Sequence, residues 1–301
     1  MNQDVIKIFV GCDPNNCDLE QMMVLEYSIR KHTQATIDIV WMQLSRDPNS
    51  FWYANPETQE GWNSSKWVTT FSGFRWGIPA YCGYAGKAIY MDADVLVLSD
   101  ISELWHHPIN PESMVAAKGA PLINRLCVSL WDCAKAREVI PSMDAFKRNP
   151  DNHYSMVDQI KAQPSLITPF NDSYNCLDGE DLALKDIKIL HYTDIDTQFS
   201  HPYSIPRLKA EGSQHWYDGQ TKPHWREDLV ALFAQYYEEA LAAGYTLEQY
   251  RVTPFGNVPK ESLTGYHGDR FVDVHHSQKK KPSKIHKWQN SIRKRWHKLF
   301  G

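Results

Sequence analysis

The sequence predicts an α/β protein built around a parallel β-sheet, and three features near the N-terminus indicate this class. Residues 5–10 (VIKIFV) are rich in β-branched apolar side chains, as in a buried strand. A turn-forming segment and an amphipathic helix follow, and residues 37–44 (IDIVWMQL) are the next candidate strand. A helix between two strands favours parallel pairing, with the helix packed on one face of the sheet.

The predicted first helix covers residues 19–31. Met22, Leu25 and Ile29 recur at helical spacing, and Asp18 is a candidate N-cap immediately before the helix. Basic residues close the segment, where they interact favourably with the helix dipole. These features predict a helix that connects the first two strands.

The later elements are predicted from hydrophobic periodicity and from turn-forming residues. Residues 45–65 show no hydrophobic period and are expected to form a long loop, of the kind that is often functional. Residues 66–84 are expected to be helical as far as Pro79, and residues 87–98 to form strands interrupted by two acids. Further strands are expected at 114–120, 126–133 and 187–193, and a helix at 226–243.

Length and composition exclude several classes of protein. With 301 residues, 42% hydrophobic and 23% charged, the chain can bury the core of one large or two modest domains. No apolar run reaches the length of a membrane-spanning helix, and six cysteines without a CxxC pair do not suggest a disulfide framework or a structural zinc site. The N-terminal residues lack the pattern of a secretory signal, so we expect a cytoplasmic protein.

The strongest chemical signal is the pair Asp92 and Asp94. They follow an apolar strand and are one residue apart, so an extended backbone points both carboxylates to one side. Hard divalent cations prefer such oxygen ligands, and a cation that bridges a diphosphate is a natural use. A solvated turn is the simple alternative. A metal-dependent phosphohydrolase is another, although the Thr or Lys motif that it would need after the two acids is not found.

The surroundings of these acids resemble glycosyltransferase family 8, which includes glycogenin and bacterial lipopolysaccharide galactosyl- and glucosyltransferases. The resemblance rests on KAIYMDADVLVLSDISELW, on FSGFRWGIP before it, and on four more segments in the same order: VGCDPNNCDLEQMMVLEYSI, Val157-Asp158-Gln159, PFNDSYN and ILHYTDIDTQFSHP. Together they span residues 5–202. The family implies a GT-A fold, with a twisted and mainly parallel sheet, which we expect over residues 1–255. Residues 256–301 are expected to form a linker and a basic tail.

The resemblance assigns roles to individual residues. It implies that Asp92, Asp94 and His191 ligate Mn²⁺ or Mg²⁺, a ligand set in which the imidazole favours Mn²⁺. The residues that it implies for binding the UDP-sugar are Gly11, Asp13, Arg75 and Ala93. An Asx-turn before Pro14 is the alternative role for Asp13.

Asp158 and Gln159 resemble the pair that holds the donor sugar in this family and are the expected catalytic residues. The family often continues with a second Asp, where this chain has Ile160. The resemblance implies retention of anomeric configuration, with a hexose moved from UDP-galactose or UDP-glucose to a lipid-linked bacterial surface glycan such as lipopolysaccharide, O-antigen or capsule. Front-face substitution is favoured, with Asp158 as the alternative nucleophile. A non-catalytic sugar- or membrane-binding protein is the remaining alternative.

Basic charge is concentrated at the C-terminal end. Residues 275–301 contain nine of the 32 Lys and Arg and none of the 36 Asp and Glu. Five apolar residues there recur every three or four positions: Ile285, Trp288, Ile292, Trp296 and Leu299. Such a stripe among basic residues is typical of a helix in a lipid interface. We therefore expect residues 279–300 to bind the anionic inner face of the bacterial cytoplasmic membrane rather than nucleic acid, docking on the body of the protein being the alternative.

Overall fold

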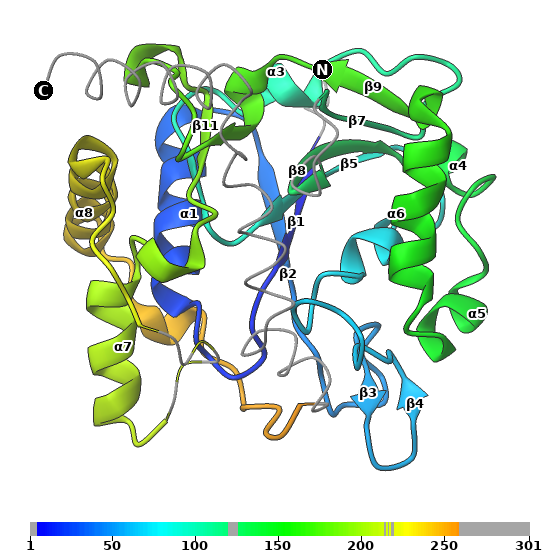
Figure 1. The fold of residues 1–301 in the computed structure, drawn as a ribbon, viewed down its shortest axis with the longest axis horizontal. Helices are drawn as coiled ribbons and strands as arrows, with labels where there is room; N and C mark the ends of the chain where they lie inside the picture. The colour runs from blue at the N-terminus through cyan, green and yellow to red at the C-terminus, as the bar shows by residue number, and fades with distance from the viewer. Residues whose placement is uncertain (1–4, 120–125, 214, 216, 218–219, 259–301) are drawn as a thin grey trace, which may run out of the picture.

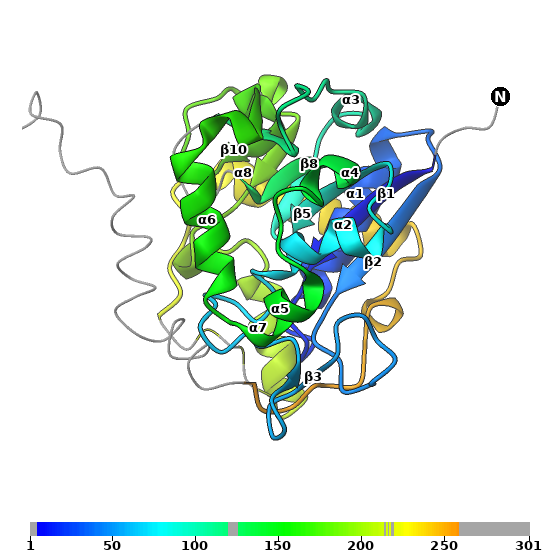
Figure 2. The same ribbon diagram turned by 90° about the vertical axis from the view of Figure 1, so that its right-hand side faces the viewer.

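The centre of the computed structural model is a six-stranded sheet with helices on both faces (Figures 1 and 2). The structure describes residues 5–119, 126–213, 215, 217 and 220–258. The strands are β1 (Ile6–Gly11), β2 (Ile37–Met42), β5 (Lys87–Asp92), β7 (Val115–Lys118), β8 (Val128–Asp132) and β9 (Ile167–Phe170). Their order is β2-β1-β5-β8-β7-β9, and all except β8 run in the same direction. The predicted α/β class with a mainly parallel sheet is confirmed.

The predicted strand–helix–strand opening is present. Helix α1 (Leu19–His32) connects β1 to β2, which pair in parallel from Ile6 opposite Ile37. Asp18 occupies the N-cap position, but its side chain makes no capping hydrogen bond. Its Oδ2 instead accepts a hydrogen bond from the backbone N of Asp13 at 2.7 Å, which closes the loop after β1.

Two groups of helices cover the sheet. Helices α1, α7 (His201–Ala210) and α8 (Glu227–Ala242) lie on one side, on the left of Figure 1. On the right are α4 (Cys133–Ala136), α5 (Met143–Arg148) and α6 (Asn152–Ala162), and Figure 2 faces this side. The remaining short helices are α2 (Ile78–Tyr81) and α3 (Ser102–Trp105). The buried face of α8 carries Leu229, Phe233, Tyr236 and Ala240, as its apolar spacing predicts.

A second, three-stranded sheet joins distant parts of the chain. It contains β6 (Val95–Val97), β10 (Cys176–Leu177) and β11 (Ile189–His191), in the order β10-β11-β6. Strands β11 and β6 are antiparallel, with His191 opposite Val95, and the backbone N of Tyr192 donates to the carbonyl of Asp94 at 3.1 Å. This pairing brings the end of β11 to the acids that follow β5.

The helix expected over residues 66–78 is wrong. Residues 65–73 form turns and bends, followed by a 3₁₀ helix at Phe74–Gly77 and then α2. Aromatic packing overrides the helical pattern here, because the Trp67 ring lies so close to Gly73 that a Cβ atom there would sit 2.3 Å from it. Pro79 lies in the first turn of α2 instead of ending a longer helix.

The expected loop at residues 45–65 also contains local structure. Strands β3 (Ala54–Asn55) and β4 (Glu60–Gly61) form a two-stranded hairpin within it. None of the described helices combines the length and hydrophobicity required to cross a bilayer. The basic tail predicted at residues 279–300 lies outside the described residues.

Candidate active site

Two carboxylates and an imidazole meet where the two sheets adjoin. Asp92 ends β5, Asp94 precedes β6, and His191 ends β11. The Nε2 atom of His191 lies 3.2 Å from Oδ1 of Asp94 and 4.0 Å from Oδ2 of Asp92. The His191 side chain is only 2% exposed. The structure therefore brings together the three residues expected to ligate a cation, and we call them the carboxylate–histidine cluster.

A hydrogen bond at Nδ1, the ring nitrogen away from the carboxylates, fixes the orientation of His191. Its Nδ1 lies 3.0 Å from Oδ1 of Asn175, and Nζ of Lys118 donates to the backbone carbonyl of Asn175 at 3.0 Å. Since the amide oxygen accepts, Nδ1 carries the hydrogen, and the lone pair of neutral Nε2 faces the carboxylates. Two acceptors then face each other across 3.2 Å, an arrangement that requires a proton or a cation between them.

The charges at the cluster shift the pKa values of His191 and Asp94 in opposite directions. Burial acts to lower the pKa of His191, but the carboxylates of Asp94 and Asp92 outweigh burial and raise it. Burial acts to raise the pKa of Asp94, and His191 outweighs it in turn, so that the pKa of Asp94 is lowered. A divalent cation would take the place of the shared proton, and the donor set of oxygen and nitrogen atoms fits Mn²⁺ or Mg²⁺.

Asp94 is also held by an amide. Nε2 of Gln198 donates to Oδ2 of Asp94 at 2.9 Å and to the carbonyl of Tyr192 at 2.8 Å. The Gln198 oxygen accepts from Nε2 of Gln21 on α1 at 2.9 Å. Both glutamines are buried, and the Gln198 amide has a partner for its oxygen and for its nitrogen. Asp94 thus has one oxygen fixed by Gln198 and the other facing His191.

Asp92 is held in the same manner by a buried cation. Nη2 of Arg75 lies 3.2 Å from Oδ1 of Asp92, and the Tyr90 hydroxyl donates to the same oxygen. Nε of Arg75 donates to the carbonyl of Ser72 at 3.0 Å. Burial acts to lower the pKa of Arg75, but Tyr90, Asp92 and Cys127 outweigh it and raise the pKa. Arg75 therefore orients Asp92, leaving Oδ2 on the His191 side.

A thiol completes this group of side chains. Cys127 immediately precedes β8, and its carbonyl accepts from the backbone N of Asp92 at 2.9 Å. Its Sγ, a carboxylate oxygen of Asp92 and a ring nitrogen of His191 all lie within 4.8 Å of one another. Burial raises the pKa of Cys127, and the charge of Asp92 adds to the effect. The sulfur faces the same space as the carboxylate–histidine cluster.

A comparison with known protein families finds a match for part of the chain. Residues 18–152, which contain β2, Arg75, Asp92, Asp94 and Cys127, match glycosyl transferase family 8. A search of curated proteins found no match to the sequence.

Several solved glycosyltransferase structures are similar to this chain. The apo structure of the bifunctional glycosyltransferase WbbM is 14% identical, with a TM-score of 0.50 over 80% of this chain and 52% of that one. The galactosyltransferase LgtC, solved with donor and acceptor sugar analogues, is 14% identical, with a TM-score of 0.49 over 78% and 96%. The apo structure of the glycosyltransferase GlyE of Streptococcus pneumoniae TIGR4 is 14% identical, with a TM-score of 0.48 over 85% of this chain and 66% of that one. The likeness to WbbM, of whose length the chain spans about half, shows the GT-A fold.

The family 8 resemblance places the nucleotide at the loop after β1. The side chain of Asp13 holds this loop by hydrogen bonds to its backbone. Oδ1 of Asp13 accepts from the backbone N of Asn15 at 2.7 Å and of Cys17 at 3.2 Å. Asp13 therefore forms the Asx-turn that was the alternative to nucleotide contact. Burial raises the pKa of Asp13 despite these hydrogen bonds. Only Oδ1 is used in the turn, so a role for Oδ2 in donor binding stays a prediction.

The other residues expected to bind the donor are also enclosed. A Cβ atom at Gly11 would lie 2.8 Å from Cδ2 of Phe71 and 3.0 Å from the Tyr90 hydroxyl, so that aromatic side chains occupy the close approach that glycine allows. Ala93 is buried between the two acids. Arg75 contacts Asp92 rather than projecting into open space.

The structure does not bring the expected catalytic pair to the cluster. Asp158 and Gln159 lie on α6, and the Asp158 side chain is 73% exposed. Oδ1 of Asp158 lies 3.1 Å from Nζ of Lys161 one turn along the helix. Among the described contacts, neither residue touches the carboxylate–histidine cluster. Their catalytic role in a family 8 enzyme stays a prediction.

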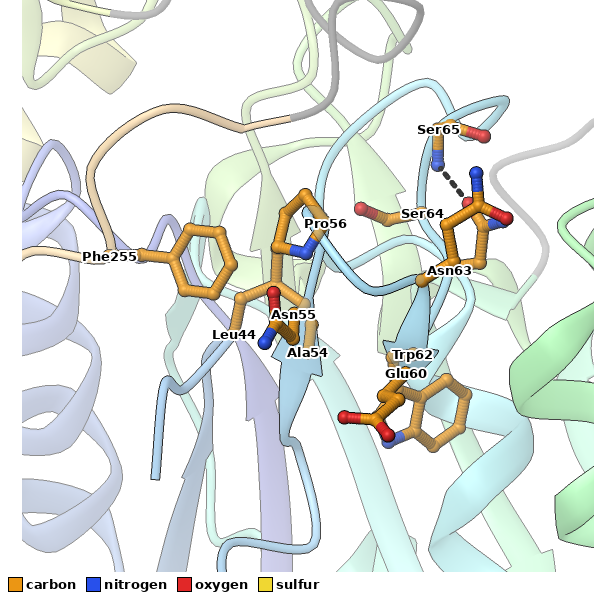
Figure 3. Close-up of a pocket in the computed structure, with 11 residues that line it drawn as sticks. Leu44, Ala54, Asn55, Pro56, Glu60, Trp62, Asn63, Ser64, Ser65 and Phe255 are labelled. Atoms are coloured by element: carbon orange, nitrogen blue, oxygen red, sulfur yellow. Dashed lines mark hydrogen bonds between the residues drawn. The ribbon is translucent and has the colours of Figure 1, made fainter. Parts of the chain in front are cut away.

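A separate cavity of about 260 Å³ lies beside the β3–β4 hairpin (Figure 3). Figure 3 shows Phe255 on one side and Asn63, Ser64 and Ser65 on the other. The backbone N of Phe255 donates to the carbonyl of Pro14 at 3.1 Å, so the cavity borders the loop after β1. Its lining includes no member of the carboxylate–histidine cluster, and it is distinct from the candidate cation site.

Three residues of the site were missed by sequence reasoning. Asn175 and Gln198 lie inside the matching segments PFNDSYN and ILHYTDIDTQFSHP, but nothing in their spacing shows which atoms they contact. Cys127 is one of six cysteines whose spacing indicates no metal site. A signal was available for Cys127, since β5 and β8 were both predicted strands and antiparallel pairing would bring their ends together.

Proposed function

We propose that this chain is a metal-dependent retaining glycosyltransferase that transfers a hexose from a UDP-sugar, with UDP-galactose or UDP-glucose favoured. The convergence of Asp92, Asp94 and His191 carries the proposal, because each residue presents a ligand atom to one small space. The family 8 match of residues 18–152 supports glycosyl transfer as the reaction class.

The cation that fits this cluster is Mn²⁺ or Mg²⁺. Asp92, Asp94 and His191 would hold it, and a cation bound there would supply Lewis-acid stabilisation of the charge that develops on UDP as it leaves. Arg75 and Gln198 each hold one carboxylate oxygen and leave the other directed toward His191. Preorganised ligands of this kind reduce the reorganisation needed when substrate binds.

For the donor, we propose binding between the loop after β1 and the cluster. Gly11, Asp13 and Ala93 would face the nucleotide, with Arg75 acting through Asp92. The GT-A fold supports this placement, since ligands of open α/β sheets bind outside the carboxyl ends of the strands. Both β1 and β5 end at this edge, with Gly11 paired to Asp92.

The proposed reaction is a front-face substitution. The acceptor hydroxyl forms a bond to the anomeric carbon on the face from which UDP departs, the bond from that carbon to the phosphate oxygen breaks, and the hydroxyl proton passes to the departing diphosphate. Gln159 would contact the sugar at the anomeric carbon, with Asp158 as the alternative nucleophile. Because Asp158 is exposed and neither residue touches the cluster, this role requires α6 to approach the bound donor.

The proposed acceptor is a lipid-linked bacterial surface glycan, such as lipopolysaccharide, O-antigen or capsule. Its support is the composition of residues 279–300, where basic and aromatic residues are arranged as in interfacial helices. We propose that residues 1–255 form the catalytic domain and that the tail holds it on the inner face of the cytoplasmic membrane. An acceptor anchored in the bilayer would then be within reach of the site.

Release of UDP from a panel of UDP-sugars in the presence of Mn²⁺ tests this proposal. Slow hydrolysis of the donor requires no acceptor, so the full-length chain can be assayed before the acceptor is known. We expect release from UDP-galactose or UDP-glucose that stops when the cation is chelated. Release of inorganic phosphate in place of UDP would indicate a phosphohydrolase and contradict the proposal.

A further inference from the structure

We propose that Cys127 is a ligand of the cation site, so that the site takes borderline-soft cations such as Co²⁺, Zn²⁺ and Cd²⁺ through a metal–sulfur bond. This inference rests on the proposed cation site and deepens it by naming a fourth donor. Carboxylate and imidazole alone favour Mn²⁺ or Mg²⁺, whereas thiolate selects softer ions.

The placement of the sulfur supports this assignment. Sγ of Cys127 and the donor atoms of Asp92 and His191 all lie within 4.8 Å of one another. Small movements of these side chains would bring all three donors to the bond lengths of about 2.0–2.3 Å that a single cation requires. Asp94 adds an oxygen, Oδ1, which lies 3.2 Å from Nε2 of His191. Three different segments therefore contribute oxygen, nitrogen and sulfur donors around one point.

The backbone fixes the sulfur at this place. Cys127 is opposite the end of β5, where the backbone N of Asp92 donates to its carbonyl at 2.9 Å. Met91 and Val128 are paired in the adjacent ladder position. Asp92 ends β5 and Cys127 immediately precedes β8, so the pairing of these two strands sets the separation of the two residues.

Charge balance at the site favours a thiolate with a divalent cation. Nη1 of Arg75 lies 3.9 Å from Sγ of Cys127, and Nη2 of the same side chain contacts Asp92. Two carboxylates and one thiolate would carry three negative charges, which Arg75 and a divalent cation balance. On binding, the S–H bond breaks, a metal–sulfur bond forms, and the proton leaves to solvent.

Two of the other described cysteines, Cys82 and Cys133, do not share this environment. Cys82 lies at the C-cap of α2, before β5 begins, and Cys133 follows the far end of β8. Among the described residues, Cys127 is the cysteine that belongs to a group of three possible metal ligands. The half-buried Cys82 is therefore a suitable control for substitution.

Co²⁺ titration of the full-length protein tests the assignment, because a sulfur ligand produces a near-ultraviolet charge-transfer band that oxygen and nitrogen ligands do not. We expect the band in the unaltered protein and in Cys82→Ser, and its loss in Cys127→Ser and Cys127→Ala. Co²⁺ affinity in the two Cys127 variants should fall on the order of tenfold, with Mn²⁺ affinity changed much less.

The outcomes separate this inference from the proposed function. If Co²⁺ binds without the band, or if the band persists in both Cys127 variants, Cys127 is not a ligand and the inference is overturned. Mn²⁺-dependent retention of UDP in the same samples would then leave the proposed glycosyltransferase intact. Binding of neither Co²⁺ nor Mn²⁺ would overturn the cation site, and with it both proposals.

Discussion

Arg75 and Asp92 form a partly buried ion pair, with Nη2 of Arg75 3.2 Å from Oδ1 of Asp92. The arrangement parallels that of Gln198 and Asp94, where the amide holds Oδ2. In both pairs, one carboxylate oxygen is fixed by a neighbouring side chain and the other is directed toward His191. The two acids of the DxD motif are therefore oriented before any substrate or cation arrives.

Substitution of Gln198 tests whether this orientation matters. In Gln198→Glu, a carboxylate replaces the amide donor beside Asp94, and repulsion should turn Asp94 away from His191. We expect Mn²⁺-dependent UDP binding, measured by calorimetry, to weaken by about 10–100-fold. The exposed Gln163→Glu at the end of α6 is the matched control and should bind normally. Equal affinity in both variants would show that Gln198 has no influence on the site.

The buried His153 provides a prediction about pH. Its Nδ1 accepts from Nε1 of Trp76 at 3.0 Å, and burial, with a smaller effect of Arg75, lowers the pKa of His153 from 6.5 to about 3. Between pH 6.5 and about pH 3, His153 therefore binds a proton in the unfolded chain but not in the folded chain. The contribution of neutral His153 to the free energy of unfolding is complete above pH 6.5 and is lost progressively as the pH falls toward 3.

His153→Asn should remove this dependence while keeping an acceptor for Trp76. Between pH 7 and pH 5, the free energy of unfolding in denaturant should fall by about 2 kcal/mol more in the unaltered protein than in the variant. His106→Asn on the surface should behave like the unaltered protein. An identical pH dependence in His153→Asn would mean that His153 is protonated in the folded state.

How much of this structure the sequence could predict depends on the range of the interactions. The β1-α1-β2 unit follows from hydrophobic spacing over neighbouring residues, and the matching segments gave the fold and the three residues of the cluster. The aromatic contacts between Trp67 and Gly73 replaced an expected helix, because packing overrides a weak local preference.

Contacts between distant segments were beyond such reasoning. Gln198 contacts Asp94, 104 residues away in the sequence. Cys127 comes close to His191 only after β5 has paired with β8 and β11 has paired with β6. The Asx-turn at Asp13 was a local alternative that sequence alone could not distinguish from nucleotide contact. The exposed position of Asp158 depends on how α6 packs, which no motif encodes.

The stereochemistry of transfer is predicted to be retention. Gln159→Ala should slow sugar transfer without trapping the sugar on the protein, because Gln159 is proposed to position the anomeric carbon and not to attack it. NMR of the product should show an α-linkage, and Gln163→Ala at the C-cap of the same helix should transfer at the normal rate. A β-linked product would reject retention, whereas a glycosylated protein found by mass spectrometry would reject only front-face substitution.

Deletion of residues 275–301 separates catalysis from location. The truncated chain should release UDP normally but no longer sediment with anionic vesicles, since it lacks the nine basic residues. High salt should weaken vesicle binding of the full-length chain, as the Debye length falls from about 8 Å to about 3 Å at 1 M. Neutral vesicles are the control. Continued sedimentation of the truncated chain would remove the support for a lipid-linked acceptor.

The most direct test of the proposed cation site is Mn²⁺-dependent UDP binding in Asp94→Asn, compared with the exposed Asp186→Asn. The amide keeps the shape of Asp94 and a partner for Gln198, but it removes the charge that faces His191. We expect the affinity to fall by about 100-fold or more in Asp94→Asn, with unchanged thermal stability and normal binding in Asp186→Asn. Undiminished Mn²⁺-dependent UDP binding in Asp94→Asn would contradict the cation site and the mechanism built on it.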